Sequence, residues 1–299
     1  MTSVCPLCGA DDASPAGDIT RDGATSTFAR CGSCSLLFVS PRPSADAIHA
    51  YYRAQGSGES YASLEERVRR EAQLYDARFQ RRLRDIGKFI APPGRLLDVG
   101  CQMGMFMAAA QRKGWTVQGV ELTLDAATEA RRRTGAAIWR GELAHAQYAA
   151  GSFDVVTCWH LIEHVLSPLA LLREARRILR PGGLLALETP NIDSVNFRRQ
   201  GLAWEYVIPP EHINYFDAAT LGRALATAGF DVCHQAYDQG SGVGKRLQQL
   251  GLGRLRQWGR THYRWVGPLR DLYVATAGRL SPQEDILVMF AKATAQPEA

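Results

Sequence analysis

The 299-residue sequence is 46% apolar and 22% charged, a composition typical of a globular protein that excludes collagen, coiled coil and disorder. Its net charge of +5 is small for this length, which argues against a dedicated nucleic-acid binder. The first residues show neither the basic nor the apolar segment of a signal peptide, and no apolar run is long enough for a membrane span. We therefore expect a cytoplasmic protein.

Four of the seven cysteines lie in the first 34 residues as two C-x-x-C pairs, Cys5 with Cys8 and Cys31 with Cys34. This spacing lets two thiolates bind one ion from a tight turn in which a glycine supplies the strained backbone. A redox pair would instead be expected beside a βαβ unit. Because four thiolates leave no coordination position for a reactive water, we predict a structural Zn²⁺ in a zinc ribbon over residues 1–43.

Residues 44–91 are predicted to form a helical linker or cap. Ser44 follows the breaker sequence SPRP and is a plausible N-cap for a helix that runs through Tyr52. After a Gly-Ser-Gly break, apolar residues recur at helical spacing among charges from Ser63 to about Ile90. The second segment is therefore expected to pack as an amphipathic helix on the larger domain.

Strand and helix patterns alternate from residue 92 onward. We predict strands at 96–99, 116–121, 153–158 and 183–188, separated by helices at 105–113, 126–134 and 169–179. A further helix, capped by Asp217, leads to an antiparallel pair at 230–232 and 285–290. Residues 92–240 and 281–299 are thus expected to form one α/β domain with a Rossmann-like doubly wound sheet.

Residues 241–280 interrupt the last two strands and carry eight basic residues against one acid, with leucines and aromatic residues interleaved. Three interpretations remain open for this basic amphipathic insertion: a lid over an anionic acceptor, a helix that contacts a membrane surface, and a packing helix with a solvated basic face.

A doubly wound sheet binds its ligand at the carboxyl ends of its central strands. The first predicted strand ends in a loop with Asp98, Gly100 and Gly104, where glycines let the backbone approach a ligand and the carboxylate suits a cationic or hydroxylated group. Glu121 ends the second strand, where an acidic side chain can accept both hydroxyls of a ribose. A solvated charge at the strand end is the alternative for Glu121.

These residues resemble the class I S-adenosylmethionine-dependent methyltransferases, in the branch that includes the ubiquinone-biosynthesis O-methyltransferases. The resemblance covers residues 90–239 and 284–294 and rests on LLDVGC at 96–101, FDVV at 153–156 with WHLIEHV at 159–165, and LRPGG at 179–183. One departure is Gln102, which stands where the family usually has glycine.

The resemblance implies S-adenosylmethionine as methyl donor and assigns the donor-binding residues. The loop that contains Asp98, Gly100, Cys101, Gln102 and Gly104 would face the methionine portion. Glu121 would bind the ribose, Leu122 would lie beside the adenine, and Glu142 would lie near its amino group. Trp159 and His160 would line the sulfonium side.

Methyl transfer to a hydroxyl also requires a group that removes a proton, and histidine titrates near neutral pH. His160 and His164 share one face of a predicted helical turn with Glu163, and His212 lies in the loop after the next strand. We predict His212 as the base, with His160 and His164 as further catalytic candidates; a structural hydrogen bond is the alternative for each. The other four histidines show no partner pattern.

In some relatives an acidic residue, a Glu-His pair three residues on and a later histidine hold Mg²⁺. Here His160 stands at the acidic position, which lowers the charge offered to a hard cation that prefers oxygen ligands. A catalytic Mg²⁺ is therefore the minor alternative.

The resulting prediction is an S-adenosylmethionine-dependent methyltransferase (EC 2.1.1.-) that acts on a small molecule, most simply by O-methylation of a sugar, a polyketide or other secondary metabolite, or a lipid-linked intermediate. An RNA methyltransferase that uses the ribbon and the basic insertion is one alternative, although the sequence CWHL at 158–161 stands where the base-flipping motif is expected, after the predicted strand at 153–158. A non-catalytic assembly module is the other.

Overall fold

The computed structural model describes residues 4–21, 23–55, 66, 72–238 and 284–294. The insertion at 241–280 and the start of the helix expected from Ser63 lie outside the described residues. Among the helices of the described part, none combines the length and apolar character needed to cross a membrane.

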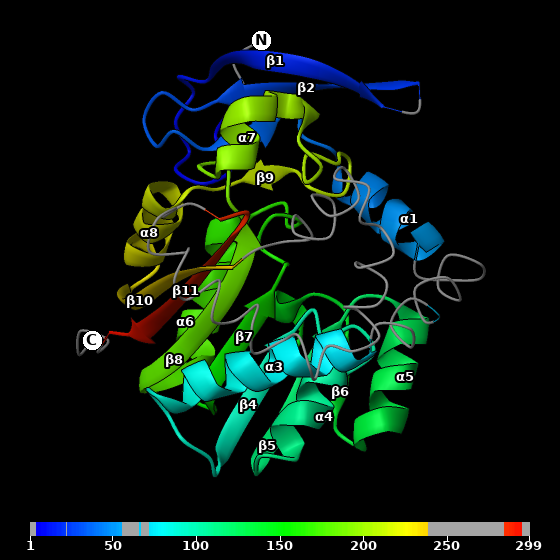
Figure 1. The fold of residues 1–299 in the computed structure, drawn as a ribbon, viewed down its shortest axis with the longest axis vertical. Coiled ribbons are helices and arrows are strands. Elements are labelled where there is room, and N and C mark those ends of the chain that lie inside the picture. Colours follow the sequence, from blue (N-terminus) through cyan, green and yellow to red (C-terminus); the bar gives the residue numbers. More distant parts are fainter. Residues whose placement is uncertain (1–3, 22, 56–65, 67–71, 239–283, 295–299) are drawn as a thin grey trace, which may run out of the picture.

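A seven-stranded sheet in the order β10-β11-β8-β7-β4-β5-β6 forms the centre of the larger part of the molecule (Figure 1). Its parallel strands are β4 (Gly94–Val99), β5 (Trp115–Glu121), β6 (Ile138–Arg140), β7 (Phe153–Trp159) and β8 (Leu179–Pro190). Strand β11 (Ile286–Ala293) runs antiparallel to both β8 and β10 (Phe230–Asp238). The α/β doubly wound fold expected from the alternating pattern is confirmed.

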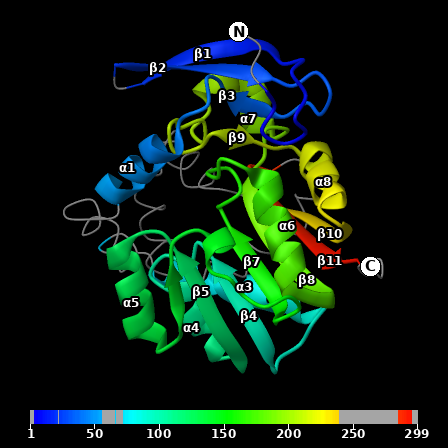
Figure 2. The same ribbon diagram turned by 180° about the vertical axis from the view of Figure 1, so that it is seen from behind.

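Helices cover both faces of this sheet, as Figures 1 and 2 show from opposite sides. Apolar residues of α3 (Ala72–Gly87), α4 (Met105–Gln111) and α5 (Leu124–Thr134) share one core with one face of the sheet. The other core joins the opposite face to α6 (Pro168–Ile178), α8 (Ala218–Thr227) and the short helix η1 (Leu143–His145). The side chain of Asp217 accepts a hydrogen bond from the Thr220 amide and caps α8, as predicted.

A second, four-stranded sheet carries the cysteine pairs at one end of the molecule (Figure 1). It consists of β1 (Ser14–Arg21), β2 (Ala24–Arg30), β3 (Leu37–Val39) and β9 (Asn214–Tyr215). Because β9 belongs to the segment after β8, the larger part of the molecule completes the sheet that carries the cysteine pairs. Helix α1 (Ala45–Gln55) follows, while α7 (Val195–Gln200) and the turn η2 (Gly201–Ala203) pack beside the same sheet.

Two local expectations differ from the structure, and two short strands have no counterpart among the predicted ones. The helix expected at 169–179 and the strand expected at 183–188 are not separated by a break, because β8 already begins at Leu179 and accommodates Pro181 and Gly182 in an irregularity of its pairing with β7. Strands β6 and β9 have only three and two residues, too few for a periodic pattern. The segment from His160 to His164 is not part of a helix. It forms a turn in which the His164 amide donates to the Leu161 carbonyl, and its first residue, His160, has a left-handed backbone (φ 50°).

Candidate functional site

The donor loop, residues 98–104, follows β4 and contains three residues with positive φ. Gly100 and Gly104 have φ values of 75° and 72°, and Gln102 has 46°. A Cβ on Gly104 would lie 3.0 Å from the Cα of Ala130 in α5, so this glycine also permits close packing. Gln102 adopts a left-handed backbone that glycine would adopt with less strain, which explains how the loop keeps its path without the usual residue.

Glu121, at the end of β5, is buried and organises the donor loop. One carboxylate oxygen accepts a hydrogen bond from the Gln102 amide at 3.0 Å, and the other accepts from the amide and hydroxyl of Thr123 at 2.8 and 2.9 Å. A carboxylate offers about four lone-pair sites, so little capacity is left for a ribose unless one of these bonds is exchanged. The structure thus adds loop positioning to the predicted ribose contact, which stays a prediction.

Asp98 is fully enclosed at the end of β4, where its carboxylate accepts a hydrogen bond from the Thr157 hydroxyl at 2.7 Å. Burial raises the pKa of Asp98 to about 7, and the neighbouring charge of Glu121 adds to this effect against the Thr157 hydrogen bond. A cationic ligand beside Asp98 would favour the ionised form, so the side chain is suited to respond to a positively charged donor.

The remaining predicted donor contacts lie around this loop. Cys101 is buried and Leu122 half-buried, while Glu142 is exposed and its carboxylate lies 2.9 Å from His49 Nε2 of α1. Trp159 packs edge-on against Phe106, and its indole Nε1 is buried without a hydrogen-bond partner among the described residues. Such an orphaned donor can hydrogen-bond to a bound molecule.

An ion network that the sequence analysis missed lies beside Trp159. Helix α3 contributes Arg78 and Arg82, which bind the buried Glu188 of β8; Arg82 Nε lies 2.7 Å from a Glu188 oxygen. Burial opposes ionisation of Glu188, but attraction to Arg78 and Arg82 outweighs it and lowers the pKa to about 2. In the sequence these arginines belong to the charged face of an amphipathic helix, a pattern that does not predict their ion pairs with Glu188.

The histidine cluster, formed by His160, Glu163, His164 and His212, lies at the carboxyl ends of β7 and β8. It joins two segments: the post-β7 turn, residues 160–166, and the β9 segment, residues 208–215. Oxygen or nitrogen atoms of Glu163, His164 and His212 all lie within 4.8 Å of one another. The structure therefore brings together all three histidines that the sequence analysis selected.

His160 has both ring nitrogens engaged. Arg78 donates to Nε2 at 2.8 Å, which places the proton on Nδ1, and Nδ1 donates to Glu163 Oε1 at 3.1 Å. An imidazole held from both sides has no lone pair left for a substrate proton. This geometry favours a positioning role for His160 over a role as base.

His212 has the opposite arrangement. Its Nδ1 donates to the Tyr206 carbonyl at 2.7 Å, which leaves the Nε2 lone pair, and the structure shows no hydrogen bond for Nε2 within its described residues. Burial lowers the pKa of His212 against the attraction of Glu163, so the ring is neutral at pH 7. A neutral imidazole with a free Nε2 can accept a proton.

Glu163 is a buried anion at the centre of the cluster. Burial opposes its ionisation, but the hydrogen bond from His160 and attraction to the neighbouring imidazoles lower its pKa to about 2. Burial also lowers the pKa of His164 to about 4, against the attraction of Glu163, and His164 Nδ1 lies 2.7 Å from the Tyr52 hydroxyl. The sequence predicts only that Tyr52 lies in a helix. It gives no signal for this contact, because no local motif marks the Tyr52 hydroxyl.

Two imidazoles and one carboxylate could also hold a metal ion. This donor set suits a borderline transition metal better than Mg²⁺, which prefers oxygen ligands. His160, at the position that is acidic in some relatives, is already engaged by Arg78 and Glu163.

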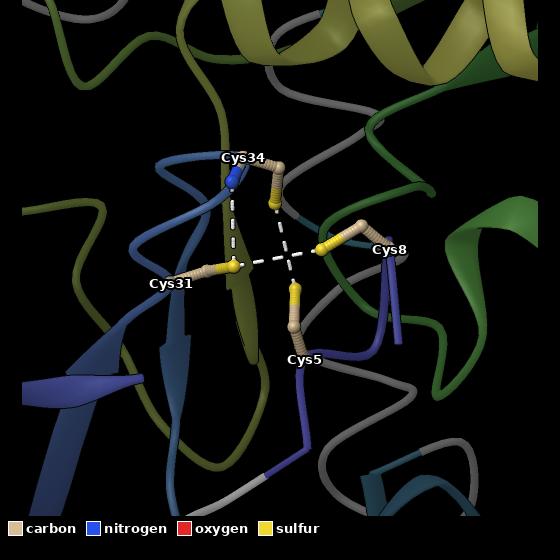
Figure 3. Close-up of side chains that lie close together, drawn as sticks. All are labelled: Cys5, Cys8, Cys31 and Cys34. Atoms are coloured by element: carbon tan, nitrogen blue, oxygen red, sulfur yellow. Dashed lines mark hydrogen bonds between the residues drawn. The ribbon is translucent and has the colours of Figure 1, made fainter. Parts of the chain in front are cut away.

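The four N-terminal cysteines converge on one point from two turns (Figure 3). The Sγ atoms of Cys5 and Cys34 are 3.5 Å apart, as are those of Cys8 and Cys31. A tetrahedral Zn²⁺ with bonds of about 2.3 Å requires sulfur–sulfur distances of about 3.8 Å, so the donor set fits Zn²⁺. The left-handed residue of the first turn is Gly9, as expected, but the second turn uses Ser35.

Gly32 serves a different purpose in the second turn. A Cβ there would lie 2.9 Å from Asp12, whose carboxylate accepts hydrogen bonds from the Gly32 amide and the Ser33 hydroxyl. Asp12 also accepts from Cys31 Sγ at 3.4 Å. The glycine therefore makes room for an acidic side chain that orients the second cysteine pair.

The fold and the sequence place this chain in one class of protein. The family model described as "Methyltransferase domain" matches residues 69–235, more than half of the chain. The chain belongs to this methyltransferase domain family, and its sheet is that of the class I S-adenosylmethionine-dependent methyltransferases.

Among curated proteins, the chain is similar to ubiquinone biosynthesis O-methyltransferases. It is 29% identical to that of Thiobacillus denitrificans over 46% of this chain and 64% of the relative. It is 32% identical to that of Ralstonia nicotianae over 46% of this chain and 60% of the relative. The match thus spans less than two thirds of the length of these relatives.

Solved structures show the same fold at low identity. A structure titled as the complex of the Haloferax volcanii Trm112 methyltransferase activator and a putative methyltransferase is 16% identical, covers 82% of this chain and 98% of that chain, and has a TM-score of 0.54. An S-adenosylmethionine-dependent methyltransferase from Archaeoglobus fulgidus is 18% identical, covers 78% and 100%, and has a TM-score of 0.53.

Proposed function

We propose that this protein transfers a methyl group from S-adenosylmethionine to a hydroxyl of a small molecule, with His212 as the base. The observation that carries the proposal is the free Nε2 of a buried, neutral His212 beside the anionic Glu163, at the sheet edge where the donor loop ends. The names of the curated relatives support oxygen as the acceptor atom.

The donor supplies an electrophilic methyl group on a sulfonium, so the protein must position two molecules and remove one proton. Asp98 and the donor loop would hold the methionine portion, and Glu121 would hold the loop and contact the ribose. His212 Nε2 would take the hydroxyl proton. Glu163 would then stabilise the imidazolium, because an adjacent carboxylate favours the charged form of histidine.

The ribbon is proposed to hold one structural Zn²⁺ through Cys5, Cys8, Cys31 and Cys34. The support is the convergence of four Sγ atoms from two turns. All four donors belong to the protein, so this ion would stabilise the fold rather than activate water.

A labelled-methyl assay tests the proposal. Protein is first titrated with S-adenosylmethionine by calorimetry, then incubated with labelled donor and either fractionated metabolite extract of the source cells or their bulk RNA. Label in a metabolite fraction, with formation of a base-stable ether, is the expected result. Label in RNA would replace the proposal with the RNA methyltransferase, and absence of donor binding would favour the assembly module.

The same assay decides whether a second metal takes part. Zinc-loaded protein is dialysed against a chelator weaker than the four-cysteine site, then assayed with Mg²⁺, Mn²⁺ or Zn²⁺ restored. Unchanged turnover after dialysis is the expected result. Recovery that needs an added ion would assign Glu163, His164 and His212 as ligands, and recovery by Mg²⁺ alone would identify the oxygen-preferring cation.

A further inference from the structure

Arg42 lies at the junction of the ribbon and α1 and reaches both segments of the histidine cluster. Its Nη1 donates to the carbonyl of Ile213 at 2.8 Å and to Asn214 Oδ1 at 3.0 Å. Its Nη2 donates to the carbonyl of Leu166 at 2.9 Å and, more weakly, to that of Val165 at 3.4 Å. One guanidinium therefore bridges the β9 segment and the post-β7 turn.

Asn214 completes the connection from the other side. Its Nδ2 donates to the Val165 carbonyl at 2.7 Å, while the amides of Ile213 and Asn214 donate to the Glu163 carbonyl at 2.9 and 3.0 Å. Asn214 is fully buried. The backbone carbonyl of Glu163 is thus bonded to the two residues that follow His212.

The hydrogen bonds of Arg42 have an unusual set of partners. Within the described part of the chain, all four go to carbonyl or amide oxygens, and burial lowers the pKa of Arg42 to about 10, so it stays charged at pH 7. Guanidinium donors have a fixed planar geometry that a lysine cannot reproduce. A surface arginine that only improved solubility would not be held in this way.

We propose that Arg42 is a positioning residue for methyl transfer: it sets the distance between Glu163 and His164 on one segment and His212 on the other. The ribbon would then supply part of the acceptor side of the site in addition to binding zinc. This inference rests on the proposed function, because it assigns Arg42 a role in the reaction of the histidine cluster.

The competing explanation is that Arg42 only attaches the ribbon. Arg223 of α8 provides a matched control, because its Nη2 donates to the carbonyl of Cys34 across the same boundary and makes no contact with the histidine cluster among the described residues. Loss of Arg223 removes an attachment of the ribbon and leaves the two cluster segments joined.

Hydrogen exchange gives a readout that needs no acceptor. In the full-length, zinc-loaded protein we expect Arg42→Ala to speed amide exchange at least about tenfold in peptides that cover residues 161–166 and 212–216, because both segments lose shared bonds. Arg223→Ala should leave those peptides at the wild-type rate. Faster exchange throughout the chain in Arg42→Ala, or equal effects of the two variants, would overturn the proposal.

Kinetics then test the link to the reaction. With labelled S-adenosylmethionine and the active metabolite fraction, kcat of Arg42→Ala should fall about 100-fold, because small displacements of reacting groups cost this much. Calorimetric donor affinity should stay within about threefold of wild type, and millimolar guanidinium should restore part of the rate of Arg42→Ala. Arg42→Lys keeps the charge without the planar geometry and should retain only part of the wild-type rate. Arg42→Lys also serves if the alanine variant does not fold.

The outcomes separate the two proposals. Wild-type kcat in a folded Arg42→Ala variant, or a loss of rate as large in Arg223→Ala, overturns the positioning role while the methyltransferase remains. Failure of the wild-type protein to bind S-adenosylmethionine overturns the proposed function, and with it the role assigned to Arg42. Faster exchange confined to residues 161–166 and 212–216, together with loss of kcat, supports both the positioning role of Arg42 and the proposed function.

Discussion

The proposed donor half and the proposed acceptor half of this site are built in different ways. The donor half comes from neighbouring parallel strands: Glu121 of β5 accepts a hydrogen bond from the Gln102 amide of the donor loop, and Asp98 of β4 accepts one from Thr157 of β7. The acceptor half joins Arg42, Tyr52, the post-β7 turn and the β9 segment, which are far apart in the sequence. The acceptor half therefore depends more on the packing of distant segments than the donor half does.

Loss of zinc is expected to give the largest effect and to separate the two halves most clearly. Cys5→Ser removes one thiolate from a type of site whose apparent binding free energy is about 10–16 kcal/mol in zinc-finger peptides. Because β9 pairs with β3 of the ribbon, we expect lower zinc content, lower thermal stability and lower turnover together. Elemental analysis, calorimetric melting and the labelled-methyl assay measure these quantities.

Donor affinity of any folded Cys5→Ser protein should remain close to wild type, because among the described residues no hydrogen bond joins the donor loop to the ribbon cysteines. A protein that lost donor binding as strongly as turnover would show that the two halves are not separable. Wild-type protein that contains no zinc and melts at the same temperature after chelation would contradict the structural role of the metal.

Removal of the base is expected to have the next largest effect. His212→Ala should lower turnover by about 10²–10⁴-fold with little change in donor affinity, because general-base catalysis contributes about this much. Since burial keeps the pKa of His212 below its ordinary value, kcat of the wild-type protein at saturating donor should be constant above about pH 6.5. It should fall at lower pH as His212 becomes protonated.

His160→Ala is the control for the base. It should have a smaller effect than His212→Ala, because His160 acts through its hydrogen bond to Glu163. A larger effect in His160→Ala would assign the base to the post-β7 turn. If both variants retain turnover, the acceptor needs no deprotonation, as for an amine or a stabilised carbanion.

Asp98 tests the donor half through pH. Its pKa of about 7 predicts that affinity for the cationic donor falls about tenfold per pH unit below pH 7 and is constant above it. Asp98→Asn should abolish this slope, and Asp98→Ala should weaken binding by about 1–3 kcal/mol. Calorimetry between pH 5.5 and 8.5, a range of about three units around that pKa, measures both.

The same carboxylate should reduce the stability of the ligand-free protein. Because its folded pKa is above the unfolded value of about 3.9, the folded state binds the proton more tightly, and stability falls as pH rises from about 4 through 7. Asp98→Asn should therefore stabilise the ligand-free protein at pH 8 by about 2–4 kcal/mol. Equal melting temperatures for the two proteins at pH 8 would show that ionisation of Asp98 does not lower the free energy of unfolding.

Glu121 separates loop positioning from direct ribose contact. Glu121→Ala should weaken donor binding by about 1–3 kcal/mol, because it leaves the amides of Gln102 and Thr123 without their acceptor. Glu121→Gln keeps one carbonyl oxygen and should have a smaller effect. Comparison of S-adenosylmethionine with its 2′-deoxy analogue then shows whether any loss depends on the ribose hydroxyl.

Gln102→Gly is expected to have the smallest effect. The substitution removes the strain of a left-handed non-glycine backbone but makes the unfolded chain more flexible, so the free energy of unfolding should change by only about 1 kcal/mol. Donor affinity should stay within about threefold of wild type. A large loss of affinity would show that the Gln102 amide side chain contacts the donor directly.

The sequence by itself determined the central sheet and the four-cysteine cluster, because both depend on short-range signals. Alternating apolar segments of four to eight residues fixed β4, β5, β7 and β8 and their crossover helices within a few residues. The C-x-x-C spacing placed each thiolate pair on one turn, and the structure brought the two pairs together as expected. The motif after β7 likewise placed His160 and His164 beside Glu163.

Only the tertiary structure decided which atoms each histidine of the cluster contacts and what holds the acceptor half together. The engagement of His160 by Arg78, the hydrogen bond of His212 Nδ1 and the bridge made by Arg42 join residues that are 82, 6 and up to 172 positions apart. No local periodicity encodes such pairs, because their partners are chosen by how the ribbon, α3 and the strand ends pack. Hydrogen-bond capacity and burial, which set the chemistry of each imidazole, exist only after that packing is formed.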